Sequence, residues 1–356
     1  MRPAAVIARI AKAAPVAAAA CTLIAASPAE AKKLPMLPLK PAATASATAH
    51  LFPTKLRDDL RAQGPRTFKA RRGRAAAAKD QFKTRDGITI PVQVSAAYTP
   101  NPAVEQGYVS FLGGLVHGSE LANLSVFIAT PRQIQSTYCG AGALACYIGD
   151  EQRMYVPGVT QHADPPVQFL IAHEYGHHIE LHRSNDPWSA YDHGTKYWAS
   201  QENVCALERR QRVTTNYYND ASEAFAESYA DMQFPGVDFI YTDLLAPDDS
   251  AFKAIRNDVL RPWRGPHTVY LRGLFAQGGR ATQTFQVPTA LDGNARFALS
   301  APEGASYSLR VLAGGRVVAR TRSAAVGYTI CGARSLTVQV TRSAGSGPFT
   351  VAANIP

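Results

Sequence analysis

The residues best suited to chemistry lie together at positions 173–177, HEYGH. Histidines four residues apart on a helix share one face, so His173 and His177 can each direct a ring nitrogen at one metal ion. Glu174 follows the first histidine, which places its carboxylate beside a water bound to that ion. Two ligands, a base and an open position make up a hydrolytic zinc site. Gly176 has no side chain, and we expect this to keep the helix face beside the metal clear.

Three further histidines lie near the pentad. The pentad falls within residues 167–183, whose first part is apolar enough for a buried helix. His178 and His182 repeat the four-residue spacing, but Ile179 stands where a glutamate would be needed. We therefore expect both at the surface or behind the ligands, not on the metal. For His193, in the loop that follows, ordinary loop packing is favoured over a role in the cleft.

A third protein ligand is expected from residues 219–233, NDASEAFAESYADMQ. Glu223, Glu227 and Asp231 are spaced four apart and share one helix face, and Asp220 can cap that helix. We assign Glu223 to the metal. We assign Glu227 to hold a ligand histidine by its other nitrogen, which is the usual support for such a ligand. An exchange of these two roles stays open.

HEYGHH, followed some forty residues later by SEAFAESYAD, resembles the gluzincin-type zinc metallopeptidases over about residues 88–235. The resemblance implies that a glutamate from a later helix completes the metal site. It also implies an oxyanion-stabilising tyrosine shortly before that glutamate, for which Tyr217 and Tyr218 both qualify. The Asn-Glu-x-x-Ser-Asp motif of thermolysin-like members and the third histidine of metzincins are absent from the sequence.

The beginning of the chain reads as an export signal. Residues 1–31 combine basic residues at the front, a small apolar run and an Ala29-Glu30-Ala31 cleavage site. We therefore expect a secreted protein with no stable membrane insertion after cleavage near Ala31.

Residues 32–86 read as a basic, Ala/Pro-rich leader or propeptide. Residues 1–86 carry 17 Lys and Arg against 5 Asp and Glu, so the net charge of +10 belongs to the front of the chain. Aromatic residues are not interleaved with this charge, and we expect no nucleic-acid partner.

The metallopeptidase domain is expected over residues 87–266. Before the metal helix, the hydrophobic spacing predicts a strand at 88–97, a helix at 102–117 and strands at 124–129 and 153–156. We expect residues 152–157 to form the edge strand that holds an extended peptide.

Four cysteines remain after the signal, as is typical of exported, disulfide-bonded proteins. Three pairings are possible. Our first choice joins Cys139 to Cys146 across a small Gly/Ala loop, and Cys205 would then pair with Cys331.

Residues 281–356 alternate in polarity between turn residues, which predicts a small β-sandwich. The segment SYSLRVLAGGRVVARTRS and the strands after it resemble the bacterial pre-peptidase C-terminal β-domains. That resemblance implies an accessory role in secretion, substrate approach or stability.

Together these features predict an α+β protein: a zincin-like metallopeptidase domain followed by a β-sandwich. The expected activity is that of a monomeric, secreted, zinc-dependent endopeptidase acting on protein or peptide substrates, with Zn²⁺ as cofactor and Glu174 as general base. Another amide or ester substrate stays open. The alternative is an exported binding or adhesion protein whose zinc is structural or vestigial.

Overall fold

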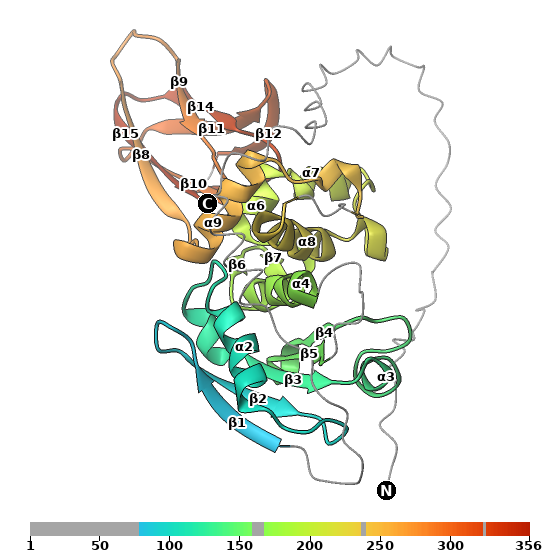
Figure 1. Ribbon diagram of the computed structural model, residues 1–356. Helices are drawn as coiled ribbons and strands as arrows, with labels where there is room; N and C mark the ends of the chain where they lie inside the picture. Colours follow the sequence, from blue (N-terminus) through green and yellow to red (C-terminus); the bar gives the residue numbers. More distant parts are fainter. Residues whose placement is uncertain (1–77, 159–166, 236–239, 323–324) are drawn as a thin grey trace, which may run out of the picture. The chain divides into compact units, whose positions relative to one another are not determined.

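A computed structural model describes residues 78–158, 167–235, 240–322 and 325–356 (Figure 1). The expected signal and the leader up to residue 77 lie outside the described residues. Helices and strands mix up to α9, and strands alone follow, so the protein is of the α+β class. Within the described segments, no helix has the length and apolar character needed to cross a membrane.

The first sheet has five strands in the order β1-β2-β3-β5-β4. β2, β3 and β5 are parallel, whereas β1 and β4 run antiparallel at the two edges. Apolar side chains alternate inward along β2 and fill nearly every position of β3, as expected of a strand covered on both faces. The strands are β1 Ala78–Lys83, β2 Thr89–Val94, β3 Ser125–Ala129, β4 Cys146–Ile148 and β5 Arg153–Pro157.

The prediction that residues 152–157 form the edge strand is wrong. These residues form β5, which lies between β3 and β4 inside the sheet. The edge strand beside the metal helix is β4, in which Cys146 pairs with Tyr155. A three-residue strand after a Gly/Ala-rich loop carries no alternation, so the sequence pattern did not reveal it.

Helices cover the sheet and build the rest of the first core (Figure 1). Their bounds are α2 Pro102–Leu112, α3 Pro131–Gln133, α4 Val167–Leu181, α5 Ala190–His193, α6 Lys196–Gln201, α7 Val204–Arg209, α8 Ala221–Gln233 and α9 Asp249–Leu260. Shorter elements are η2 Ser119–Asn123, η3 Ile134–Tyr138, η4 Gly149–Glu151, η5 Tyr217–Asn219, η6 Asp243–Leu245 and the paired strands β6 Ser184–Asn185 and β7 Trp188–Ser189. α2 ends at Leu112, earlier than expected, because two glycines follow it.

Gly176 brings α4 and α8 into contact. A Cβ at this position would lie 2.6 Å from the Ala226 Cα of α8, closer than real Cβ atoms come to a backbone. The expectation that Gly176 clears the face beside the metal is therefore wrong. Its bare face is occupied by the helix that carries Glu223 and Glu227.

The C-terminal strands form two antiparallel four-stranded sheets around a second core, which confirms a β-sandwich-like region. One sheet has the order β13-β10-β15-β8 and the other β12-β11-β14-β9. β8 lies before residue 281, where the sequence indicated the start of this region, and pairs with β15 along its whole length. The strands are β8 His267–Phe275, β9 Thr282–Pro288, β10 Gly293–Ser300, β11 Ser306–Ala313, β12 Arg316–Thr321, β13 Ala325–Ile330, β14 Ser335–Ala344 and β15 Gly347–Ile355.

Both preferred disulfide pairings are confirmed. Cys139 bonds to Cys146 across the loop before β4, and Cys205 of α7 bonds to Cys331 in the sandwich. The second bond connects segments 126 residues apart.

Candidate metal centre

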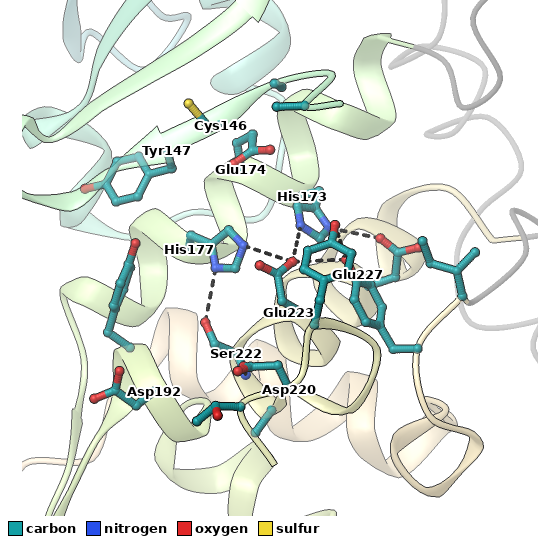
Figure 2. A pocket seen from close by; sticks show the side chains of 18 of the residues that line it. Cys146, Tyr147, His173, Glu174, His177, Asp192, Asp220, Ser222, Glu223 and Glu227 are labelled. Carbon is teal, nitrogen blue, oxygen red and sulfur yellow. Dashed lines mark hydrogen bonds and ion pairs between the residues drawn. The ribbon is translucent and has the colours of Figure 1, made fainter. Parts of the chain in front are cut away.

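His173 and His177 project from α4 toward Glu223 of α8 (Figure 2). Glu223 Oε2 lies 3.3 Å from His173 Nε2 and 3.7 Å from His177 Nε2. One ligand atom from each residue lies within 4.8 Å of the others. A tetrahedral zinc ion with bonds of about 2.0–2.1 Å separates its ligand atoms by about 3.4 Å. The three side chains therefore have the donor types and the spacing that a metal ion of this kind needs.

Glu227, one turn further along α8, faces the opposite nitrogen of the first histidine. Its Oε2 lies 2.9 Å from His173 Nδ1, and the carboxylate is buried. A carboxylate in this place orients the ring and leaves Nε2 free for a metal. Asp231, the third member of the acidic stripe, does not join the cluster, and burial raises its pKa to about 7.

Glu180 is the corresponding carboxylate for the second histidine, and the sequence analysis missed it. Its Oε2 lies 3.0 Å from His177 Nδ1, and the residue is 1% exposed. Ser222 donates a hydrogen bond of 2.7 Å to the same oxygen. The only sequence cue is the three-residue spacing from His177, which places both side chains on one helix face.

The carboxylates of Glu180, Glu223 and Glu227 alter the pKa values of the two histidines that they contact. Burial lowers the pKa of His173, but hydrogen bonds to Glu223 and Glu227 outweigh it and raise this pKa to about 9. Burial likewise disfavours the charged form of His177, yet its carboxylate neighbours raise its pKa well above the usual range. Burial acts to raise the pKa of Glu223, but the two histidines hold it well below normal. A cation binding here replaces these protons and releases them to solvent.

Glu174 is the residue that the sequence predicts to act as a base. Its side chain is 7% exposed and lines the same cleft as His173 and His177. Burial raises its pKa, while positive charge on the two histidines and a hydrogen bond from the Tyr147 backbone oppose that rise. A carboxylate with a raised pKa is better matched to proton transfer near neutral pH than an ordinary glutamate.

The two expected tyrosines differ in position. Tyr217 lines the cleft, whereas Tyr218, which is 59% exposed, does not. Tyr241, which the sequence analysis missed, is 5% exposed and donates to Glu223 Oε2 at 3.0 Å. Its hydroxyl lies 2.9 Å from the Tyr217 hydroxyl. Tyr241 lies 18 residues after Glu223, in a segment that follows the end of α8. No helical or strand repeat relates the two positions, so their contact depends on the tertiary fold.

Two other histidines differ from expectation, whereas His182 is half-buried just after α4 and is not part of the cluster. His178 was expected at the surface or behind the ligands, but it is fully buried between the Tyr147 hydroxyl and the Glu120 carbonyl, each at 2.9 Å. Burial lowers its pKa to about 4. His193 lines the cleft rather than packing only within its loop, and its Nδ1 lies 2.5 Å from Glu208.

The metal-ligand cluster opens into a cleft of about 1650 Å³. Residues 139–147, which include the first disulfide loop and part of β4, form one wall. Apolar side chains, among them Phe169, Leu170 and Ile240, share the other walls with carboxylates. Among the described residues that line it, none is Lys or Arg. The cleft can hold a molecule much larger than a water and surrounds the metal-facing atoms.

No protein-family model and no curated protein matches the sequence. Three solved structures are similar over about a quarter of the chain: the Aeromonas hydrophila periplasmic inhibitor of g-type lysozyme, PliG; the Yersinia pseudotuberculosis-derived mitogen; and the pre-peptidase C-terminal domain of a Bacillus anthracis collagenase. Identities are 16%, 14% and 12%, with 26%, 26% and 24% of this chain covered. They cover 89%, 87% and 88% of those chains, at TM-scores of 0.22, 0.22 and 0.21. Likenesses at these scores carry no argument about this protein.

Proposed function

We propose that the protein is an exported, zinc-dependent endopeptidase. The observation that carries the proposal is the convergence of His173, His177 and Glu223 next to Glu174 in one large cleft. Three protein ligands with a base beside them are typical of catalytic zinc, because the fourth position then stays open to water. Two disulfides agree with an oxidising compartment.

In this proposal each group has one task. A Zn²⁺ ion on the three ligands would lower the pKa of a bound water toward about 7. Glu174 accepts the proton of the attacking water and delivers it to the leaving amine. Of the two tyrosines left open by the sequence, Tyr217 lines the cleft and is the one proposed to donate to the carbonyl oxygen. Tyr241, whose hydroxyl contacts Tyr217 and Glu223, is proposed to support it.

A peptide substrate is proposed because the cleft, with a volume of about 1650 Å³, has room for several residues and is bordered by the edge strand β4. An amide or ester of another class would use the same chemistry.

A binding protein with a structural ion is the competing function. Structural zinc normally has four protein ligands, and the cluster among the described residues supplies three.

The test uses the full secreted chain and its Glu174→Gln variant, each measured for zinc content and for cleavage of a peptide library. We expect one zinc in both proteins and a loss of cleavage of at least about 100-fold in the variant. Cleavage by the variant at the wild-type rate would contradict the assigned base. A wild-type protein that holds zinc but cleaves no peptide would favour the binding protein.

A further inference from the structure

The site contains one arrangement that the proposed mechanism does not use. Besides holding the His177 ring, Glu180 is bound across the helix interface by Ser222, the residue directly before Glu223. The Ser222 hydroxyl also lies 3.2 Å from His177 Nδ1, a contact drawn as a dashed line in Figure 2. Three polar groups from two helices therefore meet at one point.

We propose that Ser222 and Glu180 act together as an interhelical latch that positions His177 and Glu223 for a metal ion. This inference rests on the proposed metal site and concerns how that site is assembled. Glu180 and Ser222 are positioning residues, because neither contributes a metal-facing atom.

Glu180 sets the ring orientation of His177. A carboxylate 3.0 Å from Nδ1 selects the tautomer with the proton on Nδ1 when the ring is neutral. Nε2 is then a lone-pair donor that points toward Glu223, 3.7 Å away. Glu180 lies on the same helix as His177. By itself it would orient the ring within α4 but would not fix the position of α8 relative to that ring.

Ser222 connects α8 to this pair of residues on α4. Its hydroxyl reaches Glu180 at 2.7 Å from the first turn of α8, where Asp220 caps the helix through the Ser222 backbone N–H. Neighbouring helical residues point about 100° apart. With Ser222 fixed toward Glu180, Glu223 is directed to the metal-facing nitrogens of both histidines.

The burial of Glu180 supports a functional rather than a purely structural arrangement. The carboxylate is 1% exposed, and its second oxygen has no hydrogen-bond partner among the described residues. Among the described residues its polar contacts are His177 and Ser222, and neither Lys nor Arg pairs with it. A buried carboxylate of this kind is costly unless positive charge lies nearby. The His177 ring supplies that charge when it is protonated, and a divalent ion on the neutral ring would supply it in the loaded site.

The test compares Ser222→Ala, Glu180→Gln and the double variant with wild type in the full chain. Zinc affinity is measured by chelator competition, ligand geometry by the visible spectrum of the Co²⁺-loaded protein, and fold by thermal unfolding without metal. We expect zinc affinity to fall about 10-fold in Ser222→Ala and about 10- to 100-fold in Glu180→Gln, with a changed Co²⁺ spectrum in both. The double variant should bind no more weakly than Glu180→Gln, because the serine acts through that carboxylate.

Two further variants make the result specific. Ser222→Thr keeps the hydroxyl and should restore affinity. Ser228→Ala removes a buried hydroxyl of the same helix that bonds only within α8, to Ala224 O at 2.6 Å, and should leave zinc affinity unchanged. Wild-type zinc affinity and spectrum in Ser222→Ala and Glu180→Gln would overturn the latch while leaving the metal site standing. Absence of zinc binding in the wild type would overturn both.

Discussion

At the scale of single residues, the site divides its carboxylates by the nitrogen that each one faces. Glu223 lies at the Nε2 atoms of both histidines, whereas Glu227 and Glu180 each lie at one Nδ1. A carboxylate at Nδ1 strengthens a histidine ligand without touching the metal. The two kinds of glutamate should therefore respond differently to the same substitution.

Glu223→Gln should abolish tight zinc binding, because it removes an anionic ligand. Glu227→Gln should weaken binding only about 10- to 100-fold, because the ligand set stays complete and the His173 ring alone is less well held. Chelator competition on both variants measures the difference. Equal affinities, or a greater loss in Glu227→Gln, would exchange the two roles.

At the scale of elements, the site depends on the close packing of α4 on α8. The first helix carries both histidines and the base, and the second carries Glu223. Gly176 allows the contact with Ala226 that sets their separation. The packing of the two helices and the proposed metal site are therefore coupled through a residue that is not a candidate ligand.

Gly176→Ala should lower both stability and zinc affinity. Its added methyl group would overlap the α8 backbone, and overpacking of this kind costs about 1–3 kcal/mol. Thermal unfolding and chelator competition measure the two effects. Gly149→Ala is the matched control, since its nearest neighbour is a Leu181 methyl carbon at 3.7 Å, and it should change neither. Wild-type zinc affinity in Gly176→Ala would show that the site tolerates movement of α8.

A buried histidine on α4 gives the fold an acid sensitivity. The pKa of His178 is lowered by burial to about 4, against about 6.5 in an unfolded chain. Between pH 6.5 and 4 the unfolded chain binds a proton that the folded protein does not. The free energy of unfolding should therefore fall as pH drops through this window, by about 3 kcal/mol in total.

His178→Gln can keep an acceptor for Tyr147 and a donor for the Glu120 carbonyl, but it does not titrate. Denaturant unfolding between pH 4 and 7 should show a flatter pH dependence in this variant than in wild type. His267→Gln, an exposed control on β8, should retain the wild-type slope. Identical slopes in wild type and His178→Gln would remove this histidine as the cause.

At the scale of the whole molecule, the described chain has two large hydrophobic cores, joined by covalent and polar contacts, and a small third cluster around Phe127. Beside the Cys205–Cys331 bond, Arg334 of the sandwich donates to the Ser200 carbonyl and pairs with Asp292 at 2.7 Å. Asp292 also receives a hydrogen bond from the Gly332 backbone at 2.8 Å. The Asp292 backbone N–H in turn donates to the Ser200 hydroxyl at 2.9 Å. Arg334 and the Asp292 backbone therefore join the sandwich to Ser200 beside the disulfide, and the Asp292 carboxylate holds Arg334 in place.

The two disulfides should differ in their contribution to stability. Removing Cys205–Cys331 by paired alanine substitutions frees a loop of 126 residues, worth about 5 kcal/mol in the loop-entropy model. Removing Cys139–Cys146 frees a loop of 7, worth about 2 kcal/mol. Denaturant unfolding should show the larger loss for the first pair. A larger loss for the short loop would mean that native contacts, not chain entropy, dominate.

Local spacing alone determined much of this protein. The pentad at 173–177 predicted two histidines on one face because the helical repeat requires it, and the four-residue spacing of Glu223 and Glu227 predicted their shared face. Polarity alternation predicted the C-terminal strands, and the even number of cysteines after the expected export signal led to the two disulfides. Each of these inferences rests on geometry between residues close in sequence or on a small number of alternatives.

Tertiary structure decided what local spacing does not encode. The order of strands made β4 the edge, because pairing partners are chosen across the sheet rather than along the chain. Packing through Gly176 decided which face of α8 meets the histidines, and with it the separate positions of Glu223 and Glu227. The approach of Tyr241 to Glu223 likewise depends on the path of the chain after α8. Such contacts join residues whose separation in sequence has no periodic relation to their distance in space, so only the folded chain specifies them.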